Sequence, residues 1–188
     1  GARLLVERVK AYGHPSELVI GGTRPADALW WGRGGGNKYE ELRHLREAGV
    51  PVPPFSLTPH RGWLGRSFRH MAGRDLRRGI GRDFWVEKLD VDKEFRFHIF
   101  GGKSIRRQFK EPRIENPHPW IRSWASGWKL TAGGDATEAM RRTAINAVEA
   151  LGYEFGAVDI GRLREGGFVV FEVNSRPGIE GSTVDQYA

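Results

Sequence analysis

Near the C-terminus, two apolar segments carry polar side chains at positions where a buried strand normally has none. Residues 155–160 read Phe-Gly-Ala-Val-Asp-Ile, and residues 168–174 read Phe-Val-Val-Phe-Glu-Val-Asn. Both segments have the length and composition of strands, and the Glu-Gly-Gly turn between them predicts an antiparallel pair. Because an acid in such a strand is costly to bury, something must compensate its charge.

Three of these polar residues form a candidate metal site. Glu172 and Asn174 are two residues apart and therefore face the same side of the sheet, and the antiparallel pairing brings Asp159 close to them. Two carboxylates and an amide suit Mg²⁺, which takes few protein ligands and keeps positions for phosphate and water. The alternative is a set of solvated strand-end acids or a salt-bridge cluster, but the three residues together favour a metal site.

The rest of the chain mixes helices with antiparallel strands, so the predicted class is α+β. Helices are expected at residues 37–49 and 137–151, where the apolar side chains recur at helical spacing. A hairpin joins strands 94–100 and 103–109 through two glycines. Residues 111–135 contain three prolines and are predicted to form a long loop.

Shorter segments complete this prediction. Tyr39, Leu42, Leu45 and Ala48 should form the buried face of the first helix. Two further short strands are expected around residues 63–66 and 84–86, whereas residues 1–36 give no clear pattern.

Composition limits the chemistry. The 188 residues include no Cys, which excludes disulfides, thiolate metal sites and cysteine catalysis, and fits a cytoplasmic location. No apolar run is long enough to predict a membrane span. The net charge of +7 favours a polyanionic partner, such as a nucleotide, an acidic substrate or nucleic acid. Seven Arg lie within residues 60–82, either as a solvated basic face or as a lid facing phosphate.

The acidic strands carry a family resemblance. The run Phe-Gly-Ala-Val-Asp-Ile, the thirteen-residue step from Asp159 to Glu172, and the closing Glu-Val-Asn-Ser-Arg-Pro-Gly resemble the end of the ATP-grasp domain. They are similar to D-alanine–D-alanine ligases and ribosomal-protein glutamate ligases. The resemblance implies an ATP-grasp fold, with the nucleotide between two α+β subdomains. It also implies that Asp159, Glu172 and Asn174 hold two magnesium ions on ATP, with Mn²⁺ as an alternative, and that Asn174 helps to bind the nucleotide.

The same resemblance implies a nucleotide-binding hinge. Glu87, Lys88 and Leu89 fall where the family holds adenine against the backbone, and Glu94, seven residues after Glu87, falls where a carboxylate takes the ribose hydroxyls. A carboxylate can accept hydrogen bonds from both hydroxyls. Taken alone, Glu94 would be an ordinary surface residue of a strand.

The resemblance also suggests cations for the phosphates. Lys38 starts the first helix, and Arg66 stands where the family usually has a strand Lys, just before a loop that contains His70. Where D-alanine–D-alanine ligases carry an Arg two residues before the metal Asp, this chain has Ala157. The catalytic cation is therefore expected elsewhere, as Arg66, Arg106, Arg107 or Arg122.

Three functions follow from these observations. The first is a carboxylate–amine ligase that forms an amide or peptide bond through an acyl phosphate, acting on a small-molecule or peptide carboxylate and an amine acceptor. The second is an ATP-grasp kinase, and the third is a basic nucleic-acid-binding protein. The expected organisation is a reduced N-terminal segment at 1–36, a small subdomain at 37–86 and a large subdomain at 87–188.

Overall fold

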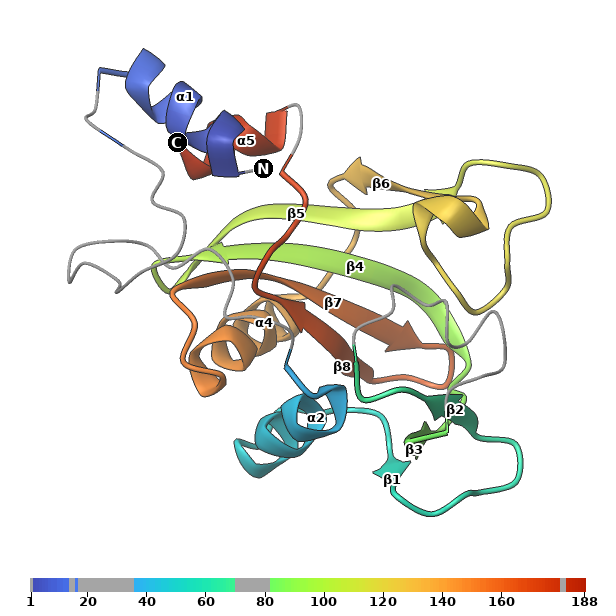
Figure 1. The fold of residues 1–188 in the computed structure, drawn as a ribbon. Helices are drawn as coiled ribbons and strands as arrows, with labels where there is room; N and C mark the ends of the chain where they lie inside the picture. The colour runs from blue at the N-terminus through green and yellow to red at the C-terminus, as the bar shows by residue number, and fades with distance from the viewer. Residues whose placement is uncertain (1, 14–15, 17–35, 70–81, 180–181) are drawn as a thin grey trace.

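The computed structural model describes residues 2–13, 16, 36–69, 82–179 and 182–188. Two antiparallel sheets form its framework, with strand orders β1-β3-β2 and β6-β5-β4-β7-β8 (Figure 1). The elements are α1 (Ala2–Ala11), α2 (Lys38–Glu47), β1 (Phe55–Ser56), β2 (Leu64–Arg66), β3 (Phe84–Val86), β4 (Val91–Phe100), β5 (Lys103–Pro112), the 3-10 turn η1 (Trp124–Ser126), β6 (Trp128–Ala132), α4 (Glu138–Ala150), β7 (Phe155–Leu163), β8 (Phe168–Asn174) and α5 (Ser182–Tyr187).

The five-stranded sheet has one apolar and one polar face. Along β4, Phe95, Phe97 and Ile99 are buried against α4 on the apolar face, and each such side chain contributes roughly 1.5–3 kcal/mol by leaving water. Glu94, Arg96 and His98 alternate with them and therefore point to the opposite face. This alternation places a row of polar side chains on the side of the sheet away from α4.

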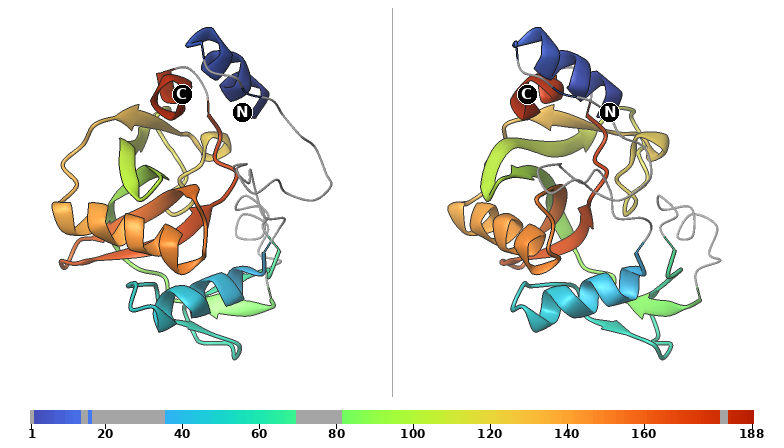
Figure 2. Two further views of the ribbon diagram at one scale, coloured as in Figure 1. Left: turned by 90° about the vertical axis from the view of Figure 1, so that its left-hand side faces the viewer. Right: turned by 60° about the vertical axis from the view of Figure 1, so that its left-hand side comes forward.

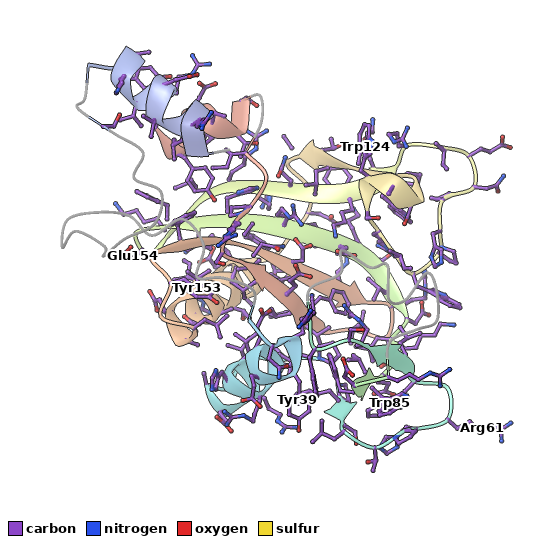
Figure 3. The ribbon with its side chains drawn as sticks, viewed as in Figure 1. Tyr39, Arg61, Trp85, Trp124, Tyr153 and Glu154 are labelled. Carbon is purple, nitrogen blue, oxygen red and sulfur yellow. The ribbon has the colours of Figure 1, made fainter. Side chains whose placement is uncertain are left out.

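The small sheet packs against α2. Leu42 of this helix joins Phe55, Phe84 and Val86 in one apolar cluster. The ring of Tyr39 packs edge-on against Phe55 and Phe84, with centroids 5.2 and 5.8 Å apart. Figure 3 shows Tyr39 lying between α2 and the small strands.

Helix ends follow the predicted signals. The side chain of Asn37 accepts a hydrogen bond from the Tyr39 amide at 2.9 Å, and that of Thr137 accepts one from the Met140 amide at 3.2 Å. Gly49 follows α2 with φ of 75°, a conformation that glycine adopts without steric cost. The two predicted helices and the hairpin are confirmed.

Four details differ from the sequence prediction. Ala48 is exposed, because α2 has already ended at Glu47. The predicted loop 111–135 contains a strand, β6, which pairs with the edge of β5. Residues 2–11 form α1, and residues 182–187 form α5; short amphipathic segments like these gain most of their stability from packing, which a single sequence does not reveal.

Helices α1 and α5 lie side by side near one end of the large sheet (Figures 1 and 2). Arg8 of α1 pairs with Asp185 of α5 at 3.0 Å. Tyr187 and Val184 of α5 pack into an apolar cluster with Phe155 of β7. Among the described residues, every helix is too short or too polar to cross a membrane.

The burial of His98 makes the stability of the fold depend on pH. Burial lowers the pKa of His98 to about 4 from its ordinary 6.5. Since the unfolded chain takes up a proton near pH 6.5 and the folded chain does not, stability falls as the pH drops from 6.5 to 4, by about 3 kcal/mol in total. Urea unfolding at pH 7 and pH 4.5 should show most of this difference in the wild type.

The His98→Leu variant isolates this effect. It should be less stable at both pH values, because it leaves Gln108 and Tyr187 without their buried partner. The difference between the two pH values should nevertheless shrink, whereas the same change at the exposed His60 should leave it as in the wild type. An unchanged difference in the His98 variant would show that His98 titrates normally in the folded chain.

Candidate functional site

A cleft of about 1080 Å³ opens over the polar face of the large sheet. Its walls come from β2, β3 and the segment 87–91 on one side and from the loop 119–124 on another. Its floor is formed by polar side chains of β4, β5, β7 and β8, and Thr183 of α5 lines it as well. A volume of this size accommodates a nucleotide together with part of a second ligand.

The three predicted metal ligands meet in this cleft. Asp159 on β7 is directly opposite Glu172 on β8, and both line the cleft together with Asn174. The pairing of β7 with β8 shifts register after Asp159, leaving Phe171 as an extra residue on β8; such bulges re-aim the side chains beside them. Gly161 leaves room for the Phe171 ring, since a Cβ there would lie 2.3 Å from it.

Asp159 is held by two cations that the sequence analysis did not assign. The Arg96 guanidinium donates from Nε to Oδ1 at 2.6 Å and from Nη2 to Oδ2 at 2.8 Å. Lys110 Nζ donates to Oδ2 at 3.1 Å and also to Glu94 Oε1. A fork that engages both carboxylate oxygens fixes the orientation of Asp159 as well as neutralising it.

Glu172 is paired in the same way with a cation from α2. Lys38 Nζ, at the start of α2, donates to Glu172 Oε2 at 2.6 Å. One turn along α2, Glu41 Oε1 accepts a hydrogen bond from the Val173 amide at 2.9 Å. The first turn of α2 is therefore bonded to the strand end that carries Glu172 and Asn174.

Burial and pairing set the ionisation of these groups. Burial opposes the charge of Asp159, but the nearby Arg96 and Lys110 charges lower its pKa to about 2. Burial raises the pKa of Glu94, while the contact with Lys110 opposes this rise. The pKa of Lys110 is raised, because two carboxylates outweigh its burial. Asp159 is thus an anion at neutral pH, and Lys110 is a cation.

The predicted hinge segment also lines this cleft. Glu87, Lys88 and Leu89 line its wall beside Val86 of the small sheet. Lys88 Nζ lies 3.6 Å from the centroid of the Trp120 ring, a cation–π contact that brings the loop 119–124 to the hinge. Figure 3 shows Trp124, from the same loop, beside β6.

Several proteins of known structure have a fold similar to that of this chain. The D-alanine–D-alanine ligase from Bacillus anthracis superposes with a TM-score of 0.59, at 15% identity over 77% of this chain and 58% of that one. The ATP-grasp ligase PsnB with its minimal precursor gives 0.55, at 16% identity over 76% and 52%. The N5-carboxyaminoimidazole ribonucleotide synthetase from Thermotoga maritima gives 0.52, at 16% identity over 76% and 42%. The chain has the ATP-grasp fold. It spans about half the length of these proteins. No protein-family model matches the sequence, and no curated protein does so.

The cationic side chains that were predicted to bind phosphate or to act in catalysis differ in their contacts. Arg66 lines the cleft from β2, and Lys38 is bound to Glu172. Arg122 also lines the cleft, but its guanidinium donates to the Val91 carbonyl at 2.7 Å and lies over the Trp128 ring. Arg122 therefore attaches its loop to β4. His70 lies outside the described residues.

The two Arg residues predicted on β5 need correction. Arg107 lies on the face opposite the cleft, because side chains alternate along a strand; it is exposed and donates to the carbonyls of Gly133 and Ala136 at 3.3 and 3.4 Å. Arg106 points to the same face as Gln108 but is not among the residues that line the cleft. Neither lines the cleft beside the three predicted metal ligands.

The sequence did carry a signal for the residues that this prediction missed. Charged or amide side chains recur at every second position on both hairpin strands, as Glu94 and Arg96 on β4 and Gln108 and Lys110 on β5. This period of two predicts one polar face. The pairing of each cation with a particular acid depends on cross-strand register, which is set by the fold.

The donor set fits a magnesium ion. Asp159, Glu172 and Asn174 offer only oxygen ligands, and they line a cleft with room for phosphate and water. The described residues contain no group of three or more His, Cys, Asp or Glu side chains that could enclose a metal alone. On a magnesium ion, Asp159, Glu172 and Asn174 would leave positions for the oxygens of a nucleotide and for water.

Proposed function

We propose that this chain binds ATP with magnesium in the cleft and acts as a carboxylate–amine ligase. The observation that carries the proposal is the convergence of Asp159, Glu172 and Asn174 on the floor of a nucleotide-sized cleft in an ATP-grasp fold. Structurally similar proteins support it. One is PsnB in complex with minimal precursor, Mg and ADP, with a TM-score of 0.53 over 81% of this chain and 59% of that one.

The nucleotide is proposed to lie along the cleft from hinge to metal site. The backbone of residues 87–89 would take the adenine edge, and Glu94 would accept the ribose hydroxyls in place of its present bond from Lys110. Lys110 remains beside Asp159, and Lys38 and Arg66 face the phosphates from the small subdomain. When bound, magnesium would neutralise charge on the phosphate oxygens at Asp159, Glu172 and Asn174.

The proposed reaction has two steps. A carboxylate oxygen of the donor attacks the γ-phosphorus of ATP, an O–P bond forms, and the bond from phosphorus to the β-bridging oxygen breaks to release ADP. An amine then attacks the acyl carbon, the C–O bond to phosphate breaks with its electron pair, and the amine nitrogen gives up a proton to solvent or phosphate. The protein contributes positioning and charge neutralisation to both steps.

The test is a screen for ADP release with paired carboxylates and amines, peptides included. An acyl phosphate can be trapped with hydroxylamine as a hydroxamate, and mass spectrometry identifies the amide product. Formation of both products supports the ligase. ADP release together with a stable phosphate ester would instead identify a kinase. An ATP affinity that is the same with and without Mg²⁺ would contradict the proposed metal site.

Glu94→Ala tests the proposed ribose contact. The variant should weaken ATP binding by about 10-fold to 100-fold, because hydrogen bonds to a charged group are lost, while the rate at saturating ATP changes little. Asp159 still pairs with Lys110 in this variant. Calorimetry measures the ATP affinity, and ADP release measures the rate at saturating ATP. Asp92→Ala on the same strand is the control. A loss confined to the rate would contradict the ribose role.

A further inference from the structure

A buried chain of hydrogen bonds joins α5 to the cleft and has no part in the proposed nucleotide contacts. Tyr187 Oη lies 2.9 Å from His98 Nδ1, and His98 Nε2 lies 3.0 Å from Gln108 Oε1. All three residues are buried: Tyr187 is 7% exposed, His98 1% and Gln108 8%. Buried polar groups of this kind are costly unless each donor meets an acceptor.

The direction of each hydrogen bond in this chain follows from its last member. Gln108 Oε1 is a carbonyl oxygen and can only accept, so His98 Nε2 must carry the proton and donate to it. His98 Nδ1 is then the acceptor, and the Tyr187 hydroxyl donates to it. With a pKa near 4, His98 keeps this single neutral form at physiological pH.

This arrangement fixes which end of the Gln108 amide enters the cleft. Its oxygen is turned toward His98, so its Nε2 group is presented on the cleft side, where Gln108 is a lining residue. Among the described residues, the structure gives Nε2 no hydrogen-bond acceptor. The buried side chains of His98 and Tyr187 thus hold Gln108 so that its two N–H donors face the cleft. Donors in this orientation suit the binding of an anionic oxygen.

Cross-strand register places these donors at the metal end of the proposed nucleotide site. Gln108 on β5 is directly opposite Arg96 on β4, and Arg96 is in turn opposite Asp159 on β7. Moving along β4 away from the hinge, Glu94 comes first, Arg96 next and His98 last. Gln108 therefore lies level with the proposed metal ligand Asp159 and farther from the hinge than the proposed ribose contact, where the transferring phosphoryl group would lie.

We propose that Gln108 donates a hydrogen bond from Nε2 to an oxygen of the phosphoryl group as it passes to the donor carboxylate, and that His98 and Tyr187 are positioning residues for this contact. The inference rests on the proposed function and deepens it by naming a substrate-contacting residue. A neutral amide suits this role because it stabilises developing negative charge without adding another cation beside Arg96 and Lys110.

Orthovanadate with saturating Mg-ADP is the probe, since it mimics a phosphoryl group in transfer. Gln108→Glu keeps an oxygen acceptor for His98 but removes the donor facing the cleft, and Gln108→Met removes both. We expect each to raise the Kd for vanadate about tenfold or more while the Kd for Mg-ADP stays within about twofold. Tyr187→Phe should raise the vanadate Kd by a smaller factor, and Tyr12→Phe, at an exposed tyrosine, should not.

Nitrogen-15 NMR of the His98 imidazole shows which ring nitrogen carries the proton, and it needs no ligand. The wild type should show His98 protonated at Nε2 alone, and Gln108→Met, which removes the oxygen that accepts from Nε2, should lose this preference. A proton on Nδ1 in the wild type, an unchanged vanadate Kd in both Gln108 variants, or an equal loss of Mg-ADP affinity overturns the inference. So does a wild type that binds Mg-ADP but not vanadate. A wild type that fails to bind Mg-ADP overturns the proposed function itself.

Discussion

Replacing Asp159 with Asn is expected to destabilise the folded chain by about 3–5 kcal/mol, although the two side chains have nearly the same shape. The carboxylate accepts both arms of the Arg96 fork and a bond from Lys110, and its side chain is only 8% exposed. An amide cannot neutralise a guanidinium, so the variant leaves buried positive charge without compensation. Urea unfolding at neutral pH measures the loss.

A second substitution separates charge from packing. Asp159→Asn combined with Arg96→Gln should recover a substantial part of the lost stability, because it removes both members of the buried pair. The matched surface control is Asp92→Asn, whose partner Arg162 stays in contact with water, and it should unfold close to the wild type. A single variant as stable as the wild type would show that Asp159 and Arg96 do not form the pair described here.

Replacing Glu172 with Gln should slow ADP release on the order of 100-fold or more, with the fold retained. Glu172 is more exposed than Asp159, at 21% of its side chain, and an amide oxygen can still accept the bond from Lys38. What the variant lacks is the negative charge that would hold a metal ion against the phosphates. Initial rates with a substrate pair found in the screen measure the effect, and circular dichroism checks the fold.

Glu111→Gln on β5 is the matched control for this substitution. Its carboxylate bonds Thr131 and Lys129 and does not line the cleft, so its rate should match that of the wild type. If Glu172→Gln also releases ADP at the wild-type rate, then Glu172 is not a metal ligand, and its pair with Lys38 only joins α2 to β8.

Much of the fold and part of the site could be predicted, because local signals were sufficient there. The N-cap at Asn37, the hairpin glycines and the apolar strands that carry Asp159 and Glu172 depend on nearby sequence alone. The α+β class and the ATP-grasp fold followed from these elements and their resemblance. The meeting of Asp159 with Glu172 followed from the turn that joins their strands.

The ion pairs could not be predicted in the same way. Arg96 meets Asp159 across 63 residues, and Lys110 meets both Glu94 and Asp159, so these contacts require the strand order β5-β4-β7. The alternation of side chains alone would have removed Arg107 from the predicted catalytic set. The role of α5 depends on the contact between Tyr187 and His98, 89 residues apart, for which the sequence gives no local sign.

ATP is proposed to bind in this cleft through a metal held by Asp159, Glu172 and Asn174. Calorimetric titration with a non-hydrolysable ATP analogue, in Mg²⁺ and then in EDTA, tests it most directly. Binding to the wild type should be tighter with Mg²⁺ by about tenfold or more, and Glu172→Gln should lose this difference. Equal affinity with and without Mg²⁺ in the wild type, or the same metal dependence in the variant, would contradict it.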